Sequence, residues 1–341
     1  MTDMKATLAL LETRRNLTRG QAAAAMELMI RGMASDDETK ALLLALREKG
    51  ATADEIAGFA HVMRAHGLPV NTSRTELIDV CGTGGDGAGT FNISTTVAFV
   101  IAGAGVNVAK HGNRSVSSQC GSSDVLEALG LRADLTPQAV VHSLNETGLG
   151  FFFAPTFHPA LKRFAQLRRE LKVRTVFNVL GPLANPAGAR RQVVGVFDGA
   201  LTEVMAYTLR ELGSEEAMVV SGEDGLDELT LTGRTRVAHL KNGKVTSYTL
   251  TPQDAGLPNA PIQALSGGDA KQNAKILRAL LAGEKGPKRD AVLYNSAAAL
   301  LVAGRAATLP EGVKLAARSI DQGNALAVLT ALQTLNGKAD K

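Results

Sequence analysis

Residues 79–96, DVCGTGGDGAGTFNISTT, place five glycines within eight residues, between an apolar strand and the start of a helix. Because glycine lacks a Cβ, successive backbone N–H groups can turn toward one point. The helix N-terminus that follows adds partial positive charge. An ordinary strand-to-helix turn would explain one or two glycines, whereas five of them beside Asp86, Asn92 and Ser94 favour a site for a phosphate or diphosphate. The segment matches neither the P-loop pattern nor the dinucleotide fingerprint.

The rest of the chain shows two different patterns. Residues 1–70 contain three capping boxes at intervals of 17 residues, which begin at Thr18, Ser35 and Thr52 and predict three short helices. From about residue 75, short apolar strands alternate with helices, as in a mostly parallel sheet with helices on both faces. The sequence therefore predicts the α/β class, with a small all-helical N-terminal domain (1–70) and a larger α/β domain (75–341). A later segment near 165–190 is expected to pack on the helical domain.

Individual elements follow from apolar runs and from their flanking turn residues. The expected strands are 77–81, 106–109, 151–154, 192–197 and 217–221, and residues 230–250 are expected to form a hairpin around Asn242-Gly243. The expected helices are 95–101, 124–129, one opened by Thr136-Pro137, 202–212, 270–281, 290–302 and a last one over roughly 309–335.

A second polar cluster, KHGNRSVSSQCGSSD at residues 110–124, follows the expected strand 106–109. It contains Lys110, His111, Asn113, Arg114 and several serines. At the carboxyl end of a parallel strand these groups would face the same crevice as the glycines. Considered alone, the stretch is also compatible with a solvated turn.

A third cluster, GEDGLDE at residues 222–228, has four carboxylates within six residues after the expected strand 217–221. Such carboxylates repel one another unless a cation or solvent relieves the charge. Mg²⁺ suits them, because it prefers oxygen ligands and bridges carboxylates to phosphates. An acidic surface turn is an equal alternative by itself, but beside a phosphate loop a metal–diphosphate site is the simpler interpretation.

Arg168 and Arg169 lie near an expected helix end, before the turn Gly181-Pro182. A guanidinium group can bind a carboxylate through two hydrogen bonds, so Arg168 could anchor an acidic second substrate. Arginines at helix ends also complement the helix dipole, which leaves a structural interpretation open.

Composition narrows the class of protein. The net charge is +4, but Lys and Arg are dispersed, aromatics make up only 4% and Trp is absent, which argues against nucleic-acid binding. Cys81 and Cys120 form neither a disulfide framework nor a metal-ligand spacing. No apolar stretch reaches the length of about 18 residues that spans a bilayer, and the N-terminus lacks the features of a signal peptide. We expect a cytoplasmic protein without a membrane partner.

Five long stretches together resemble the anthranilate phosphoribosyltransferase family of tryptophan biosynthesis: GTGGDGAGTFNIST, KHGNRSVSSQCGSSDVLEALG, RTVFNVLGPLANPA, SGEDGLDELT and LSGGDAKQNA. They keep the family's order, and the helical N-terminus and the segment AVLYNSAAALLVAG extend the resemblance over nearly the whole chain. It implies the nucleoside phosphorylase type II fold. It also implies transfer of a phosphoribosyl group from 5-phosphoribosyl-1-pyrophosphate (PRPP) to the amine of anthranilate, which gives N-(5-phosphoribosyl)anthranilate and pyrophosphate. One departure is Lys172, where the family often has glycine, and it leaves the motifs intact.

The resemblance also implies the site residues. Those expected to bind PRPP are Gly82, Gly85, Asp86, Thr90, Asn92, Ile93, Ser94, Thr95, Lys110, His111, Gly112, Asn113, Arg114, Ser115, Val116, Ser117, Ser118 and Ser122. Those expected around anthranilate are Gly82, Asn113, Arg168, His111, His158 and Pro182. Those expected to hold the cofactor, Mg²⁺, are Ser94, Asp227 and Glu228.

No covalent nucleophile with a base is evident, and none is needed. A ribosyl centre with a diphosphate leaving group can react through an oxocarbenium-like state, so the main task is to stabilise the departing charge. The apolar residues of the helical unit and the resemblance suggest a homodimer. Two alternatives stay open: a pyrimidine nucleoside phosphorylase, and a non-catalytic nucleic-acid-binding relative of the same fold. Association with an amidotransferase subunit is not decided by the sequence.

Overall fold

The computed structural model describes residues 3–115 and 119–338 and is built around one sheet of seven strands. The strands are β1 (Ile78–Gly82), β2 (Val108–Gly112), β3 (Leu149–Phe153), β4 (Arg191–Gly195), β5 (Glu216–Gly222), β6 (Thr235–Lys241) and β7 (Lys244–Leu250). Their order across the sheet is β3-β2-β1-β4-β5-β6-β7. Neighbours from β3 to β5 are parallel, and β6 and β7 join the edge antiparallel. The expectation of a mostly parallel sheet is confirmed.

The helices surround this sheet. They are α1 (Met4–Glu12), α2 (Arg19–Ile30), α3 (Asp36–Lys49), α4 (Ala53–Ala65), α5 (Ile93–Gly103), α6 (Ser122–Ala128), α7 (Pro137–Thr147), α8 (Ala154–Phe157), α9 (Phe164–Leu171), α10 (Phe177–Leu180), α11 (Leu201–Glu211), α12 (Ala270–Leu281), α13 (Pro287–Val302), α14 (Leu309–Asp321) and α15 (Asn324–Lys338). Short 3-10 turns occupy Pro159–Arg163, Gly181–Leu183, Pro252–Ala255 and Ile262–Leu265.

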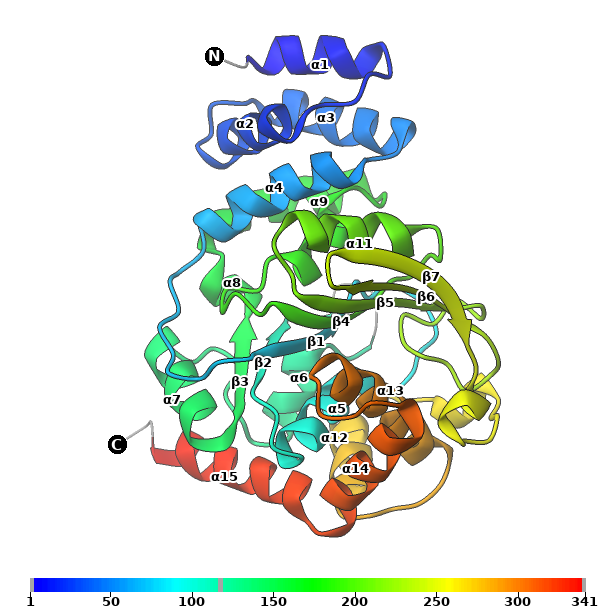
Figure 1. Ribbon diagram of the computed structural model, residues 1–341. Helices are drawn as coiled ribbons and strands as arrows, with labels where there is room; N and C mark the ends of the chain where they lie inside the picture. Colours follow the sequence, from blue (N-terminus) through cyan, green and yellow to red (C-terminus); the bar gives the residue numbers. More distant parts are fainter. Residues whose placement is uncertain (1–2, 116–118, 339–341) are drawn as a thin grey trace.

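Both faces of the sheet are covered, as expected. In Figure 1, α4, α9 and α11 lie above the sheet, and α5, α12, α13 and α14 lie below it. Side chains alternate along a strand, so each strand contributes to two cores. On β4, Val193 faces the core built on α5 and α13, whereas Val194 faces the core that α11 shares with the N-terminal helices. No helix in the described ranges is long and apolar enough to cross a membrane.

The N-terminal helices α2, α3 and α4 begin where the sequence predicts, and α1 precedes them as a helix that no capping box predicted. The capping boxes at Thr18, Ser35 and Thr52 all form, with the hydroxyl and the N3 side chain each bonded to the other's backbone. Phe164 and Leu167 of α9, and Phe177 and Leu180 of α10, are buried in the same cluster as these helices. The hairpin turn also forms as expected, since Asn242 and Gly243 both have positive φ values, 51° and 74°.

Two expected elements differ in the structure. The helix expected over 309–335 is two helices, α14 and α15, because Gly323 between them adopts a left-handed φ of 75°. The strand expected at 106–109 begins at Val108 and continues to Gly112, because it pairs with β3 along its whole length. Lys110 and His111 therefore lie within β2 rather than after it, and both are buried.

Candidate functional site

The candidate site lies at the carboxyl ends of β1 and β4. The connection after β1 leads through α5 to β2 on one side, and the connection after β4 leads through α11 to β5 on the other. Such a reversal opens a crevice at the carboxyl edge of a parallel sheet. Gly82 and Gly195 end the two strands and lie opposite each other in register.

These two glycines make room for the acidic segment that follows β5. A Cβ on Gly195 would lie 1.5 Å from the backbone oxygen of Asp227, and one on Gly82 would lie 2.6 Å from its Oδ2. Both distances are shorter than atoms tolerate, so only glycine admits Asp227 to the crevice. The expected acidic segment and the glycine loop (residues 82–89) are thus in direct contact.

The glycine loop has an irregular backbone held from both sides. Gly84, Gly85, Gly87 and Gly89 all have left-handed φ values between 64° and 75°. The N–H of Gly84 donates to Asp227 Oδ2 at 2.7 Å. The carbonyl of Gly85 accepts from the guanidinium of Arg174, which stacks on the Phe197 ring at 3.8 Å.

The N-terminus of α5 forms the opposite wall. The N–H of Ser94 donates to Glu228 Oε1 at 3.1 Å. Lys110 reaches the same place from β2, where its Nζ donates to the Val80 carbonyl at 2.6 Å and to Ser94 Oγ at 3.3 Å. The structure therefore brings together Ser94, Lys110, Asp227 and Glu228.

Acidic side chains outnumber basic ones in this crevice. Burial, then repulsion from Asp86, raises the pKa of Asp227 to about 7, and burial, then repulsion from Asp227, raises the pKa of Glu228 to about 8. Burial lowers the pKa of Lys110, an effect opposed by the charge of Asp79. A crowded carboxylate pair with one ammonium group favours the arrival of a further cation.

The residues of the crevice fit a Mg²⁺ ion that has few protein ligands. The described ranges contain no group of three His, Cys, Asp or Glu side chains arranged to hold a metal. Asp227, Glu228 and the Ser94 hydroxyl instead offer a few oxygen ligands beside the glycine loop. Mg²⁺ commonly binds through one or two carboxylates plus waters and substrate phosphates.

The remaining residues expected around PRPP have varied roles. The Asn92 side chain donates to the Cys120 carbonyl at 3.1 Å, and its Oδ1 accepts from Asn273 at 2.9 Å. The side chains of Ile93 and Thr95 are buried, at 2% exposure each, which leaves mainly their backbone groups for a ligand. The backbone of Thr90 forms a single bridge with Ser266.

The segment after β2 is folded onto α6. Ser122 Oγ accepts from the N–H of Asn113 and donates to its carbonyl, both at 3.1 Å. A Cβ on Gly112 would lie 2.4 Å from the same oxygen, so this glycine permits the close turn. The N–H of Ser115 donates to Asp124 at 3.1 Å, and the Arg114 guanidinium pairs with Asp124 and Glu127 on α6. Val116, Ser117 and Ser118 lie outside the described residues.

On the other side of β2, three of the residues expected around anthranilate meet at one turn. His111 Nδ1 donates to the Gly181 carbonyl at 3.0 Å, His158 Nε2 donates to the Ala184 carbonyl at 2.8 Å, and Pro182 lies between these two positions in the chain. The two rings contact edge to face at 5.3 Å between centroids. Burial, then the neighbouring His158, lowers the pKa of His111 to about 3, so this imidazole is neutral. Its Nε2 is buried and has no hydrogen-bond partner among the described residues.

Arg168 is on α9, as expected, and its side chain is exposed. It makes no hydrogen bond or ion pair with any residue in the described ranges. Nearby protein atoms partly desolvate the group and lower its pKa. No direct bond joins it to His111, His158 or Pro182.

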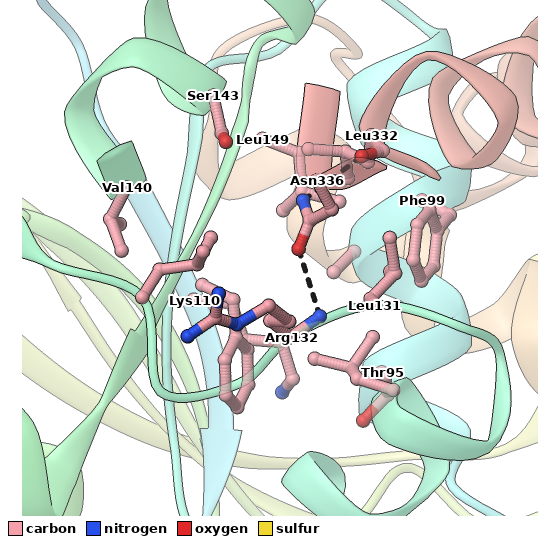
Figure 2. A pocket seen from close by; sticks show the side chains of 14 residues that line it. Thr95, Phe99, Lys110, Leu131, Arg132, Val140, Ser143, Leu149, Leu332 and Asn336 are labelled. Atoms are coloured by element: carbon pink, nitrogen blue, oxygen red, sulfur yellow. Dashed lines mark hydrogen bonds between the residues drawn. The ribbon is translucent and has the colours of Figure 1, made fainter. Parts of the chain in front are cut away.

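A small apolar cavity lies behind Lys110 (Figure 2). Its lining includes Thr95, Phe99, Leu131 and Leu149, and the carboxamide oxygen of Asn336 accepts from the N–H of Arg132 at 2.8 Å nearby. Only about 30 Å³ of it is open to a sphere the size of a water molecule. That volume holds roughly one or two waters. The cavity is too small for a sugar diphosphate and belongs to the packing behind the site.

Several polar residues at the site were not predicted from the sequence. Asp79 is fully buried in β1, where it accepts from the His111 N–H at 3.1 Å and from Asn185 Nδ2 at 2.8 Å. Arg174 and Gln192 also bond to site segments. A charged residue inside the apolar strand segment LIDVC was the one available signal, because such a residue is seldom buried without partners.

Together, the helical bundle, the α/β sheet and the crevice at the carboxyl ends of β1 and β4 are those of a glycosyl transferase. Residues 5–67 match the helical bundle domain of the glycosyl transferase family, and residues 74–326 match its a/b domain. The chain belongs to this family, and within it to the anthranilate phosphoribosyltransferases.

Individual relatives support that placement. The anthranilate phosphoribosyltransferase of Rhodopseudomonas palustris is 52% identical over 339 residues, which cover 99% of this chain and 100% of the relative. That of Moorella thermoacetica is 54% identical over 96% of this chain and 97% of the relative. Among solved structures, the Thermus thermophilus enzyme superimposes with a TM-score of 0.92 at 43% identity, over 96% of this chain and 98% of the other. The Saccharomyces cerevisiae enzyme in complex with PRPP and Mg gives 0.90 at 27% identity, over 98% of both chains.

Proposed function

We propose that the chain transfers the 5-phosphoribosyl group of PRPP to the amine of anthranilate and releases pyrophosphate. The observation that carries this proposal is the contact of the glycine loop with Asp227, beside Lys110 and the N-terminus of α5. This arrangement suits a diphosphate accompanied by a divalent cation. Relatives at about half identity over the full chain support the substrates.

Binding of PRPP would use the donors that converge on the crevice. Lys110 is buried at 3% exposure, so its charge acts on a bound phosphate with little screening from water. The N-terminus of α5 adds the partial charge of its unpaired N–H groups. These groups stabilise negative charge that develops on the leaving pyrophosphate, which lowers the barrier to breaking the glycosidic bond.

Mg²⁺ would be held by Ser94, Asp227 and Glu228 and, when bound, would neutralise both the carboxylates and the diphosphate. Asp227 and Glu228 are suited to this because their repulsion is greatest when both are ionised without a cation.

The acceptor would occupy the region of Asn113, His111, His158 and Pro182, next to Gly82. The amine of anthranilate is neutral at pH 7, so positioning matters more than deprotonation. Arg168 is the proposed anchor of the anthranilate carboxylate, since it is exposed and makes no bond within the described ranges.

The proposed domain division supports this chemistry. Residues 1–70, with the segment near 165–190, would form one unit and residues 75–341 the other, and the acceptor region would lie where the two meet. Buried residues of α9 and α10 pack in one cluster with the N-terminal helices, which supports placing this segment with the helical unit. The cluster also includes residues of β4, β5 and α11, so the two units share a core. Closure of the two units would exclude water, which would otherwise hydrolyse the activated sugar.

We also propose a homodimer through the helical unit. Met33 and Leu44 are large apolar side chains there with exposures of 69% and 39%. Sedimentation of a monomer at micromolar concentration would exclude the dimer. The cytoplasmic compartment, and the absence of nucleic-acid and membrane partners, remain predictions.

The metal-binding role has a direct test. The double change Asp227→Asn with Glu228→Gln should reduce Mg²⁺-dependent turnover about 100-fold or more, because several kcal/mol of charge stabilisation are lost. Glu223→Gln is the matched control, since Glu223 belongs to the same acidic segment but is exposed. Unchanged kinetics in the double variant would remove the pair from the site.

A further inference from the structure

The turn formed by residues 181–185 is held by an unusual set of side chains. Each of its first four carbonyl groups accepts a hydrogen bond from a side chain on a different segment. The donors are His111 to Gly181 at 3.0 Å, Gln192 to Pro182 at 2.8 Å, Arg64 to Leu183 at 2.6 Å and His158 to Ala184 at 2.8 Å. The fifth residue, Asn185, donates to Asp79 and to the Ala109 carbonyl, both at 2.8 Å.

Carbonyl groups at the end of a short helix are usually satisfied by water or by the next turn. A connection between α10 and β4 could form without these four side-chain donors. Two of the donors, His111 and His158, are themselves expected around the acceptor substrate. Two others, Arg64 and Gln192, have no role in the proposed chemistry.

Gln192 is expected to contribute little to the stability of the fold. It is fully buried in β4, and side-chain alternation places it on the same face as Val194, within the apolar core shared with the helical unit. Its Nε2 bonds to Pro182, but its Oε1 has no hydrogen-bond partner in the described part of the chain. A buried acceptor without a partner is destabilising, so this oxygen offsets much of the stability that the bond to Pro182 contributes.

Arg64 is likewise an enclosed polar side chain with few hydrogen-bond partners. Its guanidinium is largely enclosed, and desolvation lowers its pKa. It has no carboxylate partner among the described residues, and it donates only to the carbonyls of Leu183 and of Leu212, at 2.6 and 3.4 Å. Leu212 is the C-cap of α11, so Arg64 ties the helical unit to α11 and to the turn at once.

We propose that Gln192 and Arg64 are positioning residues for the acceptor substrate: their hydrogen bonds to the Pro182 and Leu183 carbonyls hold the 181–185 turn so that Pro182 and the two histidines keep one arrangement. This inference rests on the proposed function, because Pro182 matters only if the acceptor binds beside it. Neither residue touches the substrate. Gln192 therefore serves the shape of the anthranilate pocket rather than the stability of the fold, despite its unpaired oxygen.

The test is the substitution Gln192→Leu, which removes the donor and the unpaired oxygen together while keeping the side-chain volume close. We expect the thermal midpoint to change little, because removal of the unpaired Oε1 offsets the loss of the donor to the Pro182 carbonyl. The KM for anthranilate should increase about tenfold, equivalent to about 1.4 kcal/mol of lost binding. The KM for PRPP should stay within about twofold, since the glycine loop is not touched.

A matched control is Gln333→Leu. Gln333 makes the same kind of bond, from Nε2 to the Leu129 carbonyl at 2.6 Å, but on α15 behind the site. Its kinetics should be unchanged. A Gln192→Leu protein that is clearly destabilised or unfolded would show a structural role and overturn the proposal, as would unchanged anthranilate kinetics in a stable variant. If the unaltered chain turns over no anthranilate at all, the proposed function itself fails, which is a distinguishable result.

Discussion

The absence of a Cβ at two positions decides whether the acidic segment can contact the glycine loop. Gly82 and Gly195 end adjacent strands, and neither leaves space for a Cβ beside Asp227. The glycines of the site thus serve two purposes. Those with left-handed φ, such as Gly84, shape the loop, whereas Gly82 and Gly195 provide room for a carboxylate.

Gly82→Ala tests this steric role. Its Cβ would lie 2.6 Å from Asp227 Oδ2 and should displace the carboxylate. We expect Mg²⁺-dependent kcat/KM to fall about 100-fold, as when a positioned charge moves by about 1 Å. Gly233→Ala is the control, because a Cβ there meets nothing within 4 Å. Normal activity in Gly82→Ala would show that the close contact is unimportant.

The neutral state of His111 predicts a pH dependence of stability. Its pKa is about 3 in the folded protein against 6.5 as the ordinary value, so the unfolded chain takes up a proton first as the pH falls. The contribution is complete above pH 6.5 and is lost progressively below it. Between about pH 7 and about pH 5 the free energy of unfolding should drop by about 2 kcal/mol from this residue.

Urea denaturation at the two pH values measures this loss. The His111→Gln variant should lose about 2 kcal/mol less than the unaltered chain over that interval. His142→Gln, at an exposed position, should behave like the unaltered chain. Identical losses in all three proteins would mean that His111 is not held neutral.

At the scale of elements, the N-terminal helices are defined by their caps. The box at Thr52 differs from the others because Glu55 is fully buried. Its carboxylate accepts from the N–H groups of Leu17 and Thr52 at 2.8 and 2.7 Å, and it pairs with the nearly buried Lys49 at 2.9 Å. This one side chain therefore joins the start of α4 to the end of α3 and to the segment before α2.

Removing it should be strongly destabilising. Glu55→Ala leaves two backbone donors buried without a partner and leaves the nearly buried Lys49 without its carboxylate, although Lys49 still donates to Asn16 and to the Gly50 carbonyl. We expect a loss of about 3–5 kcal/mol in the free energy of unfolding. Glu38→Ala removes the equivalent capping-box residue of α3, which is only partly buried, and should cost much less. Chemical denaturation compares the two, and equal losses would contradict the burial argument.

Local sequence signals explain which elements could be predicted. Capping boxes, the Asn242-Gly243 turn and apolar strand runs each act within a few residues, and the elements they define are confirmed. The break at Gly323 was missed although residues 321–324 are all polar or glycine and a glycine commonly ends a helix. The contacts of Asp79 with Asn185 could not be predicted, since they join residues 106 positions apart and depend on the register of β1, β2 and the turn. The same applies to Arg64 and Leu183, which are 119 positions apart.

At the scale of the whole molecule, two sets of side chains and loops lie near the carboxyl edge of the sheet. The glycine loop, Lys110 and the acidic segment gather at the carboxyl ends of β1, β2 and β4, on the proposed PRPP side. The 181–185 turn is bonded to the two histidines and, through Arg64, to the helical unit on the proposed acceptor side. His111 of β2 belongs to both sets, so the two proposed substrates would meet at the end of this strand.

The most direct measurement of the central proposal is the fluorescence of anthranilate mixed with the protein, PRPP and Mg²⁺. The proposed function predicts that the fluorescence disappears as PRPP is consumed, with one pyrophosphate released per anthranilate, and that a chelator of Mg²⁺ stops the loss. Constant fluorescence, together with phosphate-dependent cleavage of uridine or thymidine, would contradict it and would favour a pyrimidine nucleoside phosphorylase.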